Sequence, residues 1–118
     1  MSISKLTLMT AAVVVLFVAC ESVPEPAEIP QDLSTQEYFQ TAQEAVDQRH
    51  YETALVYYRT FLDRYPDDTE NRIAARYEIA FLHYKMEDYD TAKRLFEELL
   101  ARYEGEEGEE GEETPEEE

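Results

Sequence analysis

The feature that most constrains this chain is a repeat of its own sequence at an offset of 38 residues. The run YETA at 51–54 returns as YDTA at 89–92, and the pair Arg-Tyr at 64–65 returns at 102–103. Self-similarity with a period of roughly 20–50 residues is typical of solenoids, in which one supersecondary unit stacks on the next. Residues 34–103, which hold both copies, are therefore expected to fold as a short stack of two units.

Each unit has the apolar periodicity of two helices. Apolar side chains in 69–86 follow a helical spacing on two faces, which is typical of a helix sandwiched between neighbours. The same kind of spacing predicts helices near 35–48, 51–65, 69–86 and 89–103, joined by short turns and without strands. The predicted fold class is therefore all-α.

Side chains that can cap a helix stand at three of the expected helix starts. Ser34 followed by Glu37 has the form of a capping box, in which a hydroxyl and a carboxylate satisfy free amide groups. Asp67 followed by Glu70 lies just after a proline and predicts another start. Asp88 precedes the last expected helix and can cap it.

The N-terminal residues differ in composition from the repeats. Lys5 is followed by an uncharged run at 6–19, which is shorter than the ~20 apolar residues of a membrane-spanning helix. Its length and flanks are typical of a secretory signal peptide over 1–19. Cys20, the only cysteine, follows this run directly and resembles the modified cysteine of a bacterial lipobox, which implies that it is lipidated. The alternative is an uncleaved signal anchor with an incidental cysteine.

Two further segments lack helical apolar periodicity. Residues 20–33 hold three of the five prolines and are expected to form an extended tether with a reach of up to about 40 Å. Residues 104–118 contain ten glutamates, and a like-charge run without apolar side chains is predicted to stay disordered. The expected order is a signal peptide at 1–19, the lipidated cysteine and tether at 20–33, two repeats at 34–103, and a disordered tail at 104–118.

The two copies resemble a known family. Their pattern of an aromatic residue, an alanine three positions later and further aromatic and apolar positions is similar to the second helix of the tetratricopeptide repeat. These positions are Tyr51, Ala54, Tyr58, Phe61 and Pro66 in the first copy, and Tyr89, Ala92, Phe96 and Leu99 in the second. The helix ends FLDRYPDD and LLARY, joined to a lipoprotein signal, resemble more narrowly the BamD-like outer-membrane assembly lipoproteins. The resemblance implies a short α-solenoid of two helix-turn-helix repeats that binds protein partners.

The resemblance also implies where a partner binds. The first-helix positions that line the concave face in tetratricopeptide proteins are here Phe39, Gln43, Val46, Asp47, Tyr77, Phe81, Tyr84 and Lys85. An aromatic groove with one lysine suits an extended peptide or a partner helix, and the alternative is a plain packing surface. Other tyrosines match positions that pack between helices, namely Tyr38, Tyr51, Tyr58, Tyr89 and Tyr103.

The last expected helix presents a second candidate surface. Its apolar side chains cover an arc of roughly 140°, and a glutamate-rich segment follows it in place of another apolar helix. Exposed apolar surface of this extent marks an interface. We expect Leu95, Leu100 and Tyr103 to mediate either self-association into a homo-oligomer or the docking of a stable partner.

Charge and composition argue against several functions. Ten Lys and Arg against 28 Asp and Glu give a net charge of −18, which argues against nucleic acid and anionic lipid headgroups as partners. The two histidines, His50 and His83, have no metal-ligand spacing, so we expect neither a metal site nor a cofactor. Ser34 is the only serine within 34–103 and is expected to cap a helix, and Cys20 is expected to carry lipid, so an enzyme with a serine or cysteine nucleophile is not expected and the protein is predicted to be non-enzymatic.

The sequence thus predicts a non-enzymatic lipoprotein of the bacterial cell envelope that faces the periplasm or the exterior, with the outer membrane favoured. It is expected to act as a protein–protein adaptor in envelope assembly or maintenance. Two alternatives stay open. One is an accessory regulator of a cell-wall enzyme or secretion complex, and the other is an envelope protein that binds cations weakly through its glutamate tail.

Overall fold

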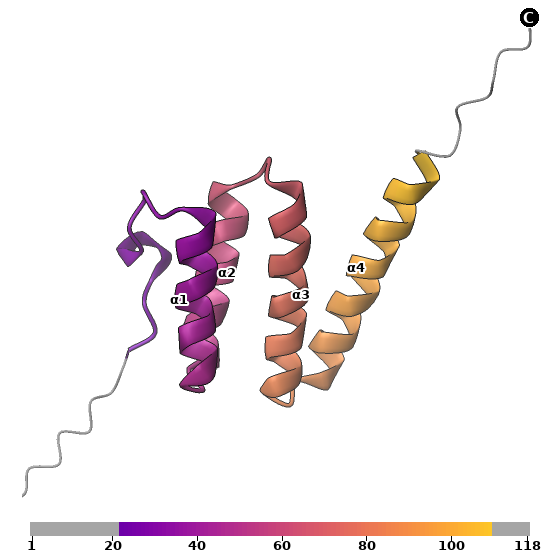
Figure 1. The fold of residues 1–118 in the computed structure, drawn as a ribbon. Helices are drawn as coiled ribbons and strands as arrows, with labels where there is room; N and C mark the ends of the chain where they lie inside the picture. The colour runs from indigo at the N-terminus through magenta and orange to yellow at the C-terminus, as the bar shows by residue number, and fades with distance from the viewer. Residues whose placement is uncertain (1–21, 110–118) are drawn as a thin grey trace, which may run out of the picture.

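The structure is a computed structural model that describes residues 22–109. Its elements are a short 3-10 helix, η1 (Pro26–Glu28), and four α-helices: α1 (Thr35–Asp47), α2 (Tyr51–Arg64), α3 (Thr69–Lys85) and α4 (Tyr89–Glu109). Helices next to each other in the sequence pack together, so that α1, α2, α3 and α4 form two successive helix-turn-helix units (Figure 1). The predicted all-α class is confirmed, and the part of the chain described contains no strand.

The helix starts follow from local capping. The hydroxyl oxygen of Ser34 accepts a hydrogen bond from the Glu37 amide at 3.3 Å, and the Glu37 carboxylate accepts one from the Ser34 amide at 2.7 Å. This is the predicted capping box. The expectation of Asp67 as the next cap was wrong by one residue. Asp68 caps α3, because its carboxylate accepts hydrogen bonds from both the backbone and the side chain of Asn71.

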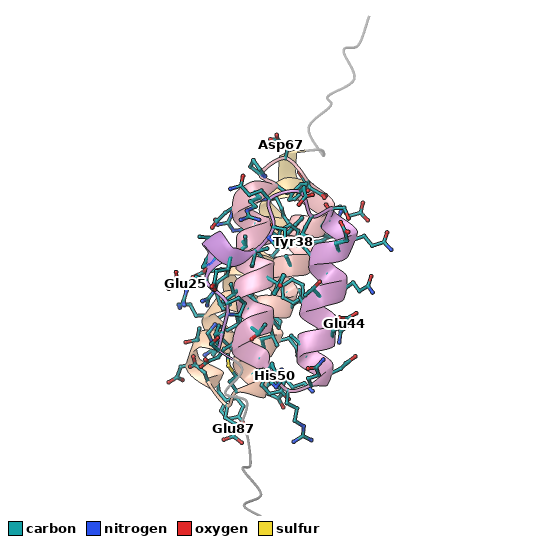
Figure 2. All side chains as sticks on the ribbon, turned by 90° about the vertical axis from the view of Figure 1, so that its left-hand side faces the viewer. Glu25, Tyr38, Glu44, His50, Asp67 and Glu87 are labelled. Atoms are coloured by element: carbon teal, nitrogen blue, oxygen red, sulfur yellow. The ribbon has the colours of Figure 1, made fainter. Side chains whose placement is uncertain are left out.

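The turns that close the two units share one backbone conformation. Arg49 after α1 and Glu87 after α3 lie 38 residues apart, and both have a φ of 63°. In each turn the next amide donates to a carbonyl five residues back, at 2.8 Å and 2.9 Å. This Schellman arrangement satisfies the free carbonyl groups at a helix end. Figure 2 shows His50 and Glu87 at the same end of the molecule, with Asp67 at the opposite end.

The centre of the core lies in the first unit. Among the residues whose burial the structure describes, the largest fully buried side chains are Tyr38, Tyr58, Phe61, Ile29 and Leu82, of which only the last comes from α3 or α4. In Figure 2, Tyr38 lies within the packed helices, whereas Glu44 points outward from α1. The second unit is held mainly through smaller or partly buried side chains, so it relies more on its contact with the first.

The proline-rich segment is part of this core, which corrects the expectation of an extended tether over 20–33. Ile29 is only 2% exposed. The Arg64 guanidinium donates hydrogen bonds to the carbonyl oxygens of Pro26, Ile29 and Pro30 at 3.0, 3.1 and 2.7 Å. Because an arginine in α2 satisfies three carbonyls of a segment poor in internal hydrogen bonds, the segment folds back against α2.

The last helix is longer than predicted, which corrects the expected start of disorder at 104. Helix α4 continues through 104–109. Glutamate is a good helix former, and no proline occurs between Tyr89 and Pro115, so a helix nucleated on α3 can propagate beyond its packed turns. The rest of the predicted tail, together with the predicted signal peptide and Cys20, lies outside the residues described. None of the helices within 22–109 is long and apolar enough to span a membrane.

Candidate protein-interaction surfaces

Three aromatic side chains form a stacked series along α3. Tyr77, Phe81 and Tyr84 are spaced by four and three residues, which places them on one side of the helix. The Tyr77 and Phe81 rings are nearly parallel with centroids 6.4 Å apart, and Phe81 and Tyr84 are stacked at 6.1 Å. The ammonium group of Lys85 lies 5.2 Å from the Phe81 ring centroid, within the range of a cation–π contact.

Helix α4 extends this series with two edge-on aromatic contacts. Phe96 meets Tyr77 at 5.6 Å, and Tyr89 meets Tyr84 at 5.5 Å. We refer to Tyr77, Phe81, Tyr84, Tyr89 and Phe96 together as the aromatic row. Its three tyrosines remain 49–56% exposed, so the row is a solvent-facing surface held in shape by its own contacts. The expectation that Tyr89 lies in a packing position was therefore wrong.

The predicted end interface on α4 divides into two parts. Leu100 and Tyr103 are 61% and 54% exposed, and their spacing places them on the same side of the helix. Leu95 is partly buried and packs against the core. Tyr103 thus fits the interface expectation and not the packing position also suggested for it. Among the residues described, no helix covers this side of α4.

The predicted groove residues do not line one groove. Phe39 and Gln43 line a groove of about 730 Å³ between α1 and α3, together with Thr35, Gln36, Gln40, Tyr58, Asn71 and Glu78. Tyr77, Phe81, Tyr84 and Lys85 belong to the aromatic row. Val46 packs against the core, and Asp47 accepts a hydrogen bond from the Gln43 amide at 3.2 Å.

The groove between α1 and α3 contains the carboxyl group of Glu78, which is partly removed from solvent. Burial raises the pKa of Glu78 above its usual value of 4.5. Burial, with a smaller contribution from the charge of Glu78, raises the pKa of Tyr58 to about 12. The groove therefore offers a carboxyl whose charged form is disfavoured, together with the side-chain amide groups of Gln43 and Asn71, whereas Tyr58 beneath it is only 1% exposed. These are hydrogen-bonding groups suited to a polar ligand such as a peptide backbone.

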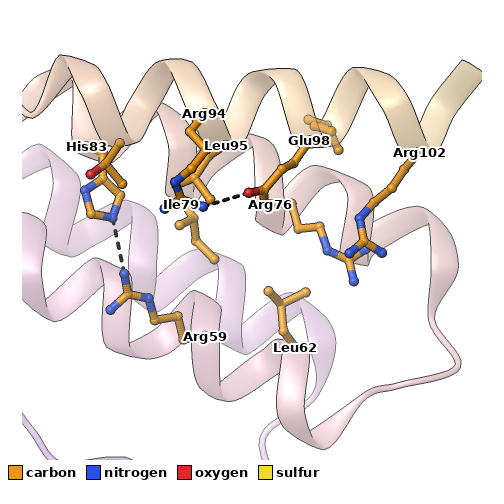
Figure 3. A pocket seen from close by; sticks show the side chains of 11 residues that line it. Arg59, Leu62, Arg76, Ile79, His83, Arg94, Leu95, Glu98 and Arg102 are labelled. Atoms are coloured by element: carbon orange, nitrogen blue, oxygen red, sulfur yellow. Dashed lines mark hydrogen bonds and ion pairs between the residues drawn. The ribbon is translucent and has the colours of Figure 1, made fainter.

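A second cavity, between α2, α3 and α4, was not predicted. It has a volume of about 310 Å³ and contains four arginines and one carboxylate, Glu98 (Figure 3). The arginines are Arg59, Arg76, Arg94 and Arg102, and we call this cavity the arginine pocket. Arg94 donates to Glu98 at 2.7 Å. The repeat contained one sign of this pocket. At the offset of 38 residues, Arg76 of the second copy stands where the first copy has Tyr38, so a charged side chain replaces an aromatic one.

His83 joins three elements at one end of the arginine pocket. Its Nε2 lies 3.2 Å from the Arg59 guanidinium, and its Nδ1 lies 3.0 Å from the Asp88 carboxylate (Figure 3 shows the first contact). A guanidinium can only donate, so Nε2 accepts and Nδ1 carries the hydrogen that is donated to Asp88. Hydrogen bonds from Thr91 and, to a smaller extent, from His83 lower the pKa of Asp88. His83 therefore has a structural role, as a link between α2, α3 and the turn before α4.

No arrangement typical of metal binding occurs within 22–109, where no group of three or more His, Cys, Asp or Glu side chains converges. The expectation of a non-enzymatic protein stays a prediction.

Comparison with known proteins identifies one of the two units. Residues 74–105, which run from α3 into α4, match the tetratricopeptide repeat family. The second unit is a tetratricopeptide repeat. The first has the same helix-turn-helix form and the same closing turn. Proteins with tetratricopeptide repeats bind other proteins, which assigns a protein-interaction role to this fold and leaves the partner open.

A relative extends the comparison beyond this repeat. An uncharacterized protein of Treponema pallidum (strain Nichols) is 30% identical over 86 residues, which cover 73% of this chain and 34% of the relative. The chain thus matches only about a third of the length of that protein. No solved structure matches the chain significantly.

Proposed function

We propose that this chain is a lipid-anchored adaptor of the bacterial cell envelope that binds a partner protein through the aromatic row and the adjoining exposed side of α4. The observation that carries this proposal is the exposure of large apolar side chains on the second repeat. Within residues 22–105, whose side chains the structure describes, six large hydrophobic side chains are exposed, and five of them lie on α3 or α4, namely Tyr77, Tyr84, Tyr89, Leu100 and Tyr103.

Solenoid packing explains why this surface suits a partner. Tetratricopeptide units stack, and each second helix is normally covered by the next unit or by a capping helix. In the first repeat, α2 is covered by α3. In the second repeat α4 has no such neighbour among the residues described. A partner helix or extended segment placed there would continue the stack and bury the aromatic side chains, which are favoured anchors at protein interfaces.

The membrane anchor is part of the proposal and is supported by the sequence. The apolar run at 6–19 ends at Cys20, and lipidation of that residue would attach more than one acyl chain, as stable anchoring requires. Docking of the proline-rich segment limits the distance between the repeats and the membrane. Only residues 21–25 separate Cys20 from η1, and five residues span at most about 18 Å. The repeats would therefore lie close to the membrane surface, where other envelope proteins are accessible.

The resemblance to BamD-like lipoproteins favours the outer membrane and a role in assembly or maintenance of the envelope. Co-purification from cells tests the adaptor role. The double variant Y77S/Y84S removes two exposed rings, whereas the control E44S/Q48S changes one exposed side chain on α1 and one directly after its end. We expect recovery of the envelope partner to fall at least about tenfold for Y77S/Y84S and to be unchanged for the control. Equal recovery by both variants would refute the proposed surface.

A further inference from the structure

The N-terminal segment meets the helices first at one end of the molecule. Ser22 and Pro24 line a surface hollow of about 200 Å³ whose other walls include Gln48, His50 and Thr53. Val23 lines a second hollow, of about 230 Å³, with the same turn and the first residues of α2. Residues 22–24 therefore lie at the turn that closes the first helix-turn-helix unit.

From this turn the segment runs along α2 to its other end. The carbonyl oxygens of Pro26, Ile29 and Pro30 accept hydrogen bonds from Arg64, the last residue of α2. Because α2 has 14 residues, its two ends lie about 20 Å apart. Contacts at both ends of α2 thus fix the direction of the segment relative to the helices.

These contacts distinguish the two ends of the helical stack. We call the end with the turns at 48–50 and 86–88 the entry end, because the N-terminal segment joins the helices there. The opposite end, with the turn between α2 and α3, is the far end. Figure 2 shows His50 and Glu87 at the entry end and Asp67 at the far end.

We propose that the entry end faces the membrane and that the far end points away from it. The inference rests on the proposed membrane anchor. Cys20 precedes Ser22 by two residues, which span at most about 7 Å, so an anchor at Cys20 holds the entry end near the lipid headgroups. An uncleaved apolar run at 6–19 would leave the membrane at the same point of the chain, so the orientation does not depend on lipidation itself.

The side chains of the entry end suit a lipid surface. Val23 and Tyr89 are both exposed there. A tyrosine has an apolar ring and a polar hydroxyl, which suits the boundary between headgroups and water. Arg49 and Lys85 are exposed at this end among carboxylates, so its charge is mixed. The anchor, and not electrostatic attraction, therefore supplies the attachment.

The far end is unsuited to the same position. Helix α4 ends there at Glu109 (Figure 1), and the ten glutamates of 104–118 begin on its last turns. Anionic lipid headgroups repel such a concentration of negative charge. The charge distribution and the attachment point thus favour the same orientation.

The orientation also limits the kind of partner. The aromatic row begins near the entry end with Tyr84 and Tyr89 and continues along α3 to Tyr77, about 10 Å further from the bilayer. A protein that contacts the whole row therefore lies within roughly 20 Å of the bilayer surface. The partner is accordingly a protein held at the same membrane.

Single tryptophans can measure this orientation, because the chain contains none. The variants Q48W and D90W place one at the entry end, and D67W and E104W place one at the far end, all at exposed positions. Each full chain is purified from membranes and reconstituted into vesicles of phosphatidylethanolamine and phosphatidylglycerol that contain a lipid with a spin-labelled headgroup. We expect quenching at the entry end to exceed that at the far end at least about threefold, because about one helix length, ~20 Å, separates the positions.

Three controls accompany this comparison. Acrylamide, a quencher dissolved in water, should act about equally on all four variants in the absence of the labelled lipid. Circular dichroism should match that of the native chain. A Gly-Ser linker of about twelve residues, inserted between Glu21 and Ser22, should lower the quenching of Q48W at least about twofold, because it lengthens the tether by about 20 Å.

Several results would overturn the proposed orientation. They are equal quenching at all four positions, stronger quenching at 67 and 104, or quenching that the inserted linker leaves unchanged. Strong quenching at both 90 and 104 would mean that α4 lies flat on the bilayer, which also contradicts the proposal. The mass of the purified chain tests lipidation separately, since a chain without acyl groups that still shows the expected quenching refutes only the lipid. A chain that does not float with vesicles refutes both the anchor and the orientation.

Discussion

The guanidinium of Arg64 donates a 2.7 Å hydrogen bond to the carbonyl oxygen of Pro30, a residue 34 positions earlier in the chain. The same side chain binds two further carbonyls of the proline-rich segment and the hydroxyl of Tyr38. One arginine at the end of α2 thus fixes the N-terminal segment, the first helix and the second helix relative to each other. The segment from Pro26 to Pro30 is consequently part of the folded core.

Replacing this arginine should release the segment. We expect Arg64→Met to lower the free energy of unfolding in urea by about 2 kcal/mol, because several hydrogen bonds to a charged donor are lost together. Limited proteolysis should show faster cleavage near residues 26–33. The matched control is Arg102→Met at the equivalent position of the second repeat, where we expect a loss below about 0.5 kcal/mol. Equal losses would contradict the anchoring role of Arg64.

A buried hydroxyl in α2 provides a test of the core. Thr60 is 3% exposed, and its Oγ1 finds no hydrogen-bond partner within the residues described. Thr60→Val replaces that hydroxyl with a methyl group of similar shape and should raise the free energy of unfolding by about 1 kcal/mol. The control Thr35→Val removes a hydroxyl that donates to Asp68 at 3.1 Å and should destabilise the protein. Destabilisation by Thr60→Val would show that its hydroxyl is satisfied.

Stability should depend on pH through Glu78. Burial raises its pKa in the folded state, so the folded protein holds this proton more tightly than the unfolded chain does. The contribution of Glu78 to stability is therefore present below pH 4.5 and is lost as pH rises through the folded-state pKa. Glu78→Gln should raise the urea midpoint at pH 7 and leave it unchanged at pH 3. Equal gains at both pH values would point to a packing effect and not to ionisation.

The proposed anchor can be tested at its one modified residue. We expect Cys20→Ser to abolish lipid attachment, detected by mass spectrometry as loss of the added acyl mass. The protein should then keep its signal peptide and fail to be processed like the native chain. If neither the native nor the substituted chain carried any acyl mass, the N-terminus would be an uncleaved anchor without lipid, and the proposed lipidation would be contradicted.

The fold could be predicted from the sequence where local and periodic signals agree. The spacing of apolar residues located all four helices, and Ser34 with Glu37 fixed the start of α1, because capping depends on residues close in sequence. The docking of Ile29 could not be predicted. It depends on Arg64, and nothing in the sequence between the two residues signals a contact over that separation.

The candidate surfaces, like the fold, could be predicted only where they depend on residues close in sequence. Tyr77, Phe81 and Tyr84 were identified from their helical spacing, whereas their separation from Phe39 and Gln43 depends on how α3 is rotated against α1. The arginine pocket was missed because its residues come from three helices. Only the pairing of Arg76 with Tyr38 across the repeat gave a sequence-level sign of it.

The central claim is that the second repeat docks a partner protein through its exposed aromatic surface. A photo-crosslinking amino acid placed at Tyr84, and in a separate chain at Glu44 on α1, tests this claim in intact cells. We expect position 84 to give a discrete crosslinked product with an envelope protein and position 44 to give none above background. The absence of a product at position 84, equal products at both positions, or a product formed only by two copies of this chain would contradict the adaptor role.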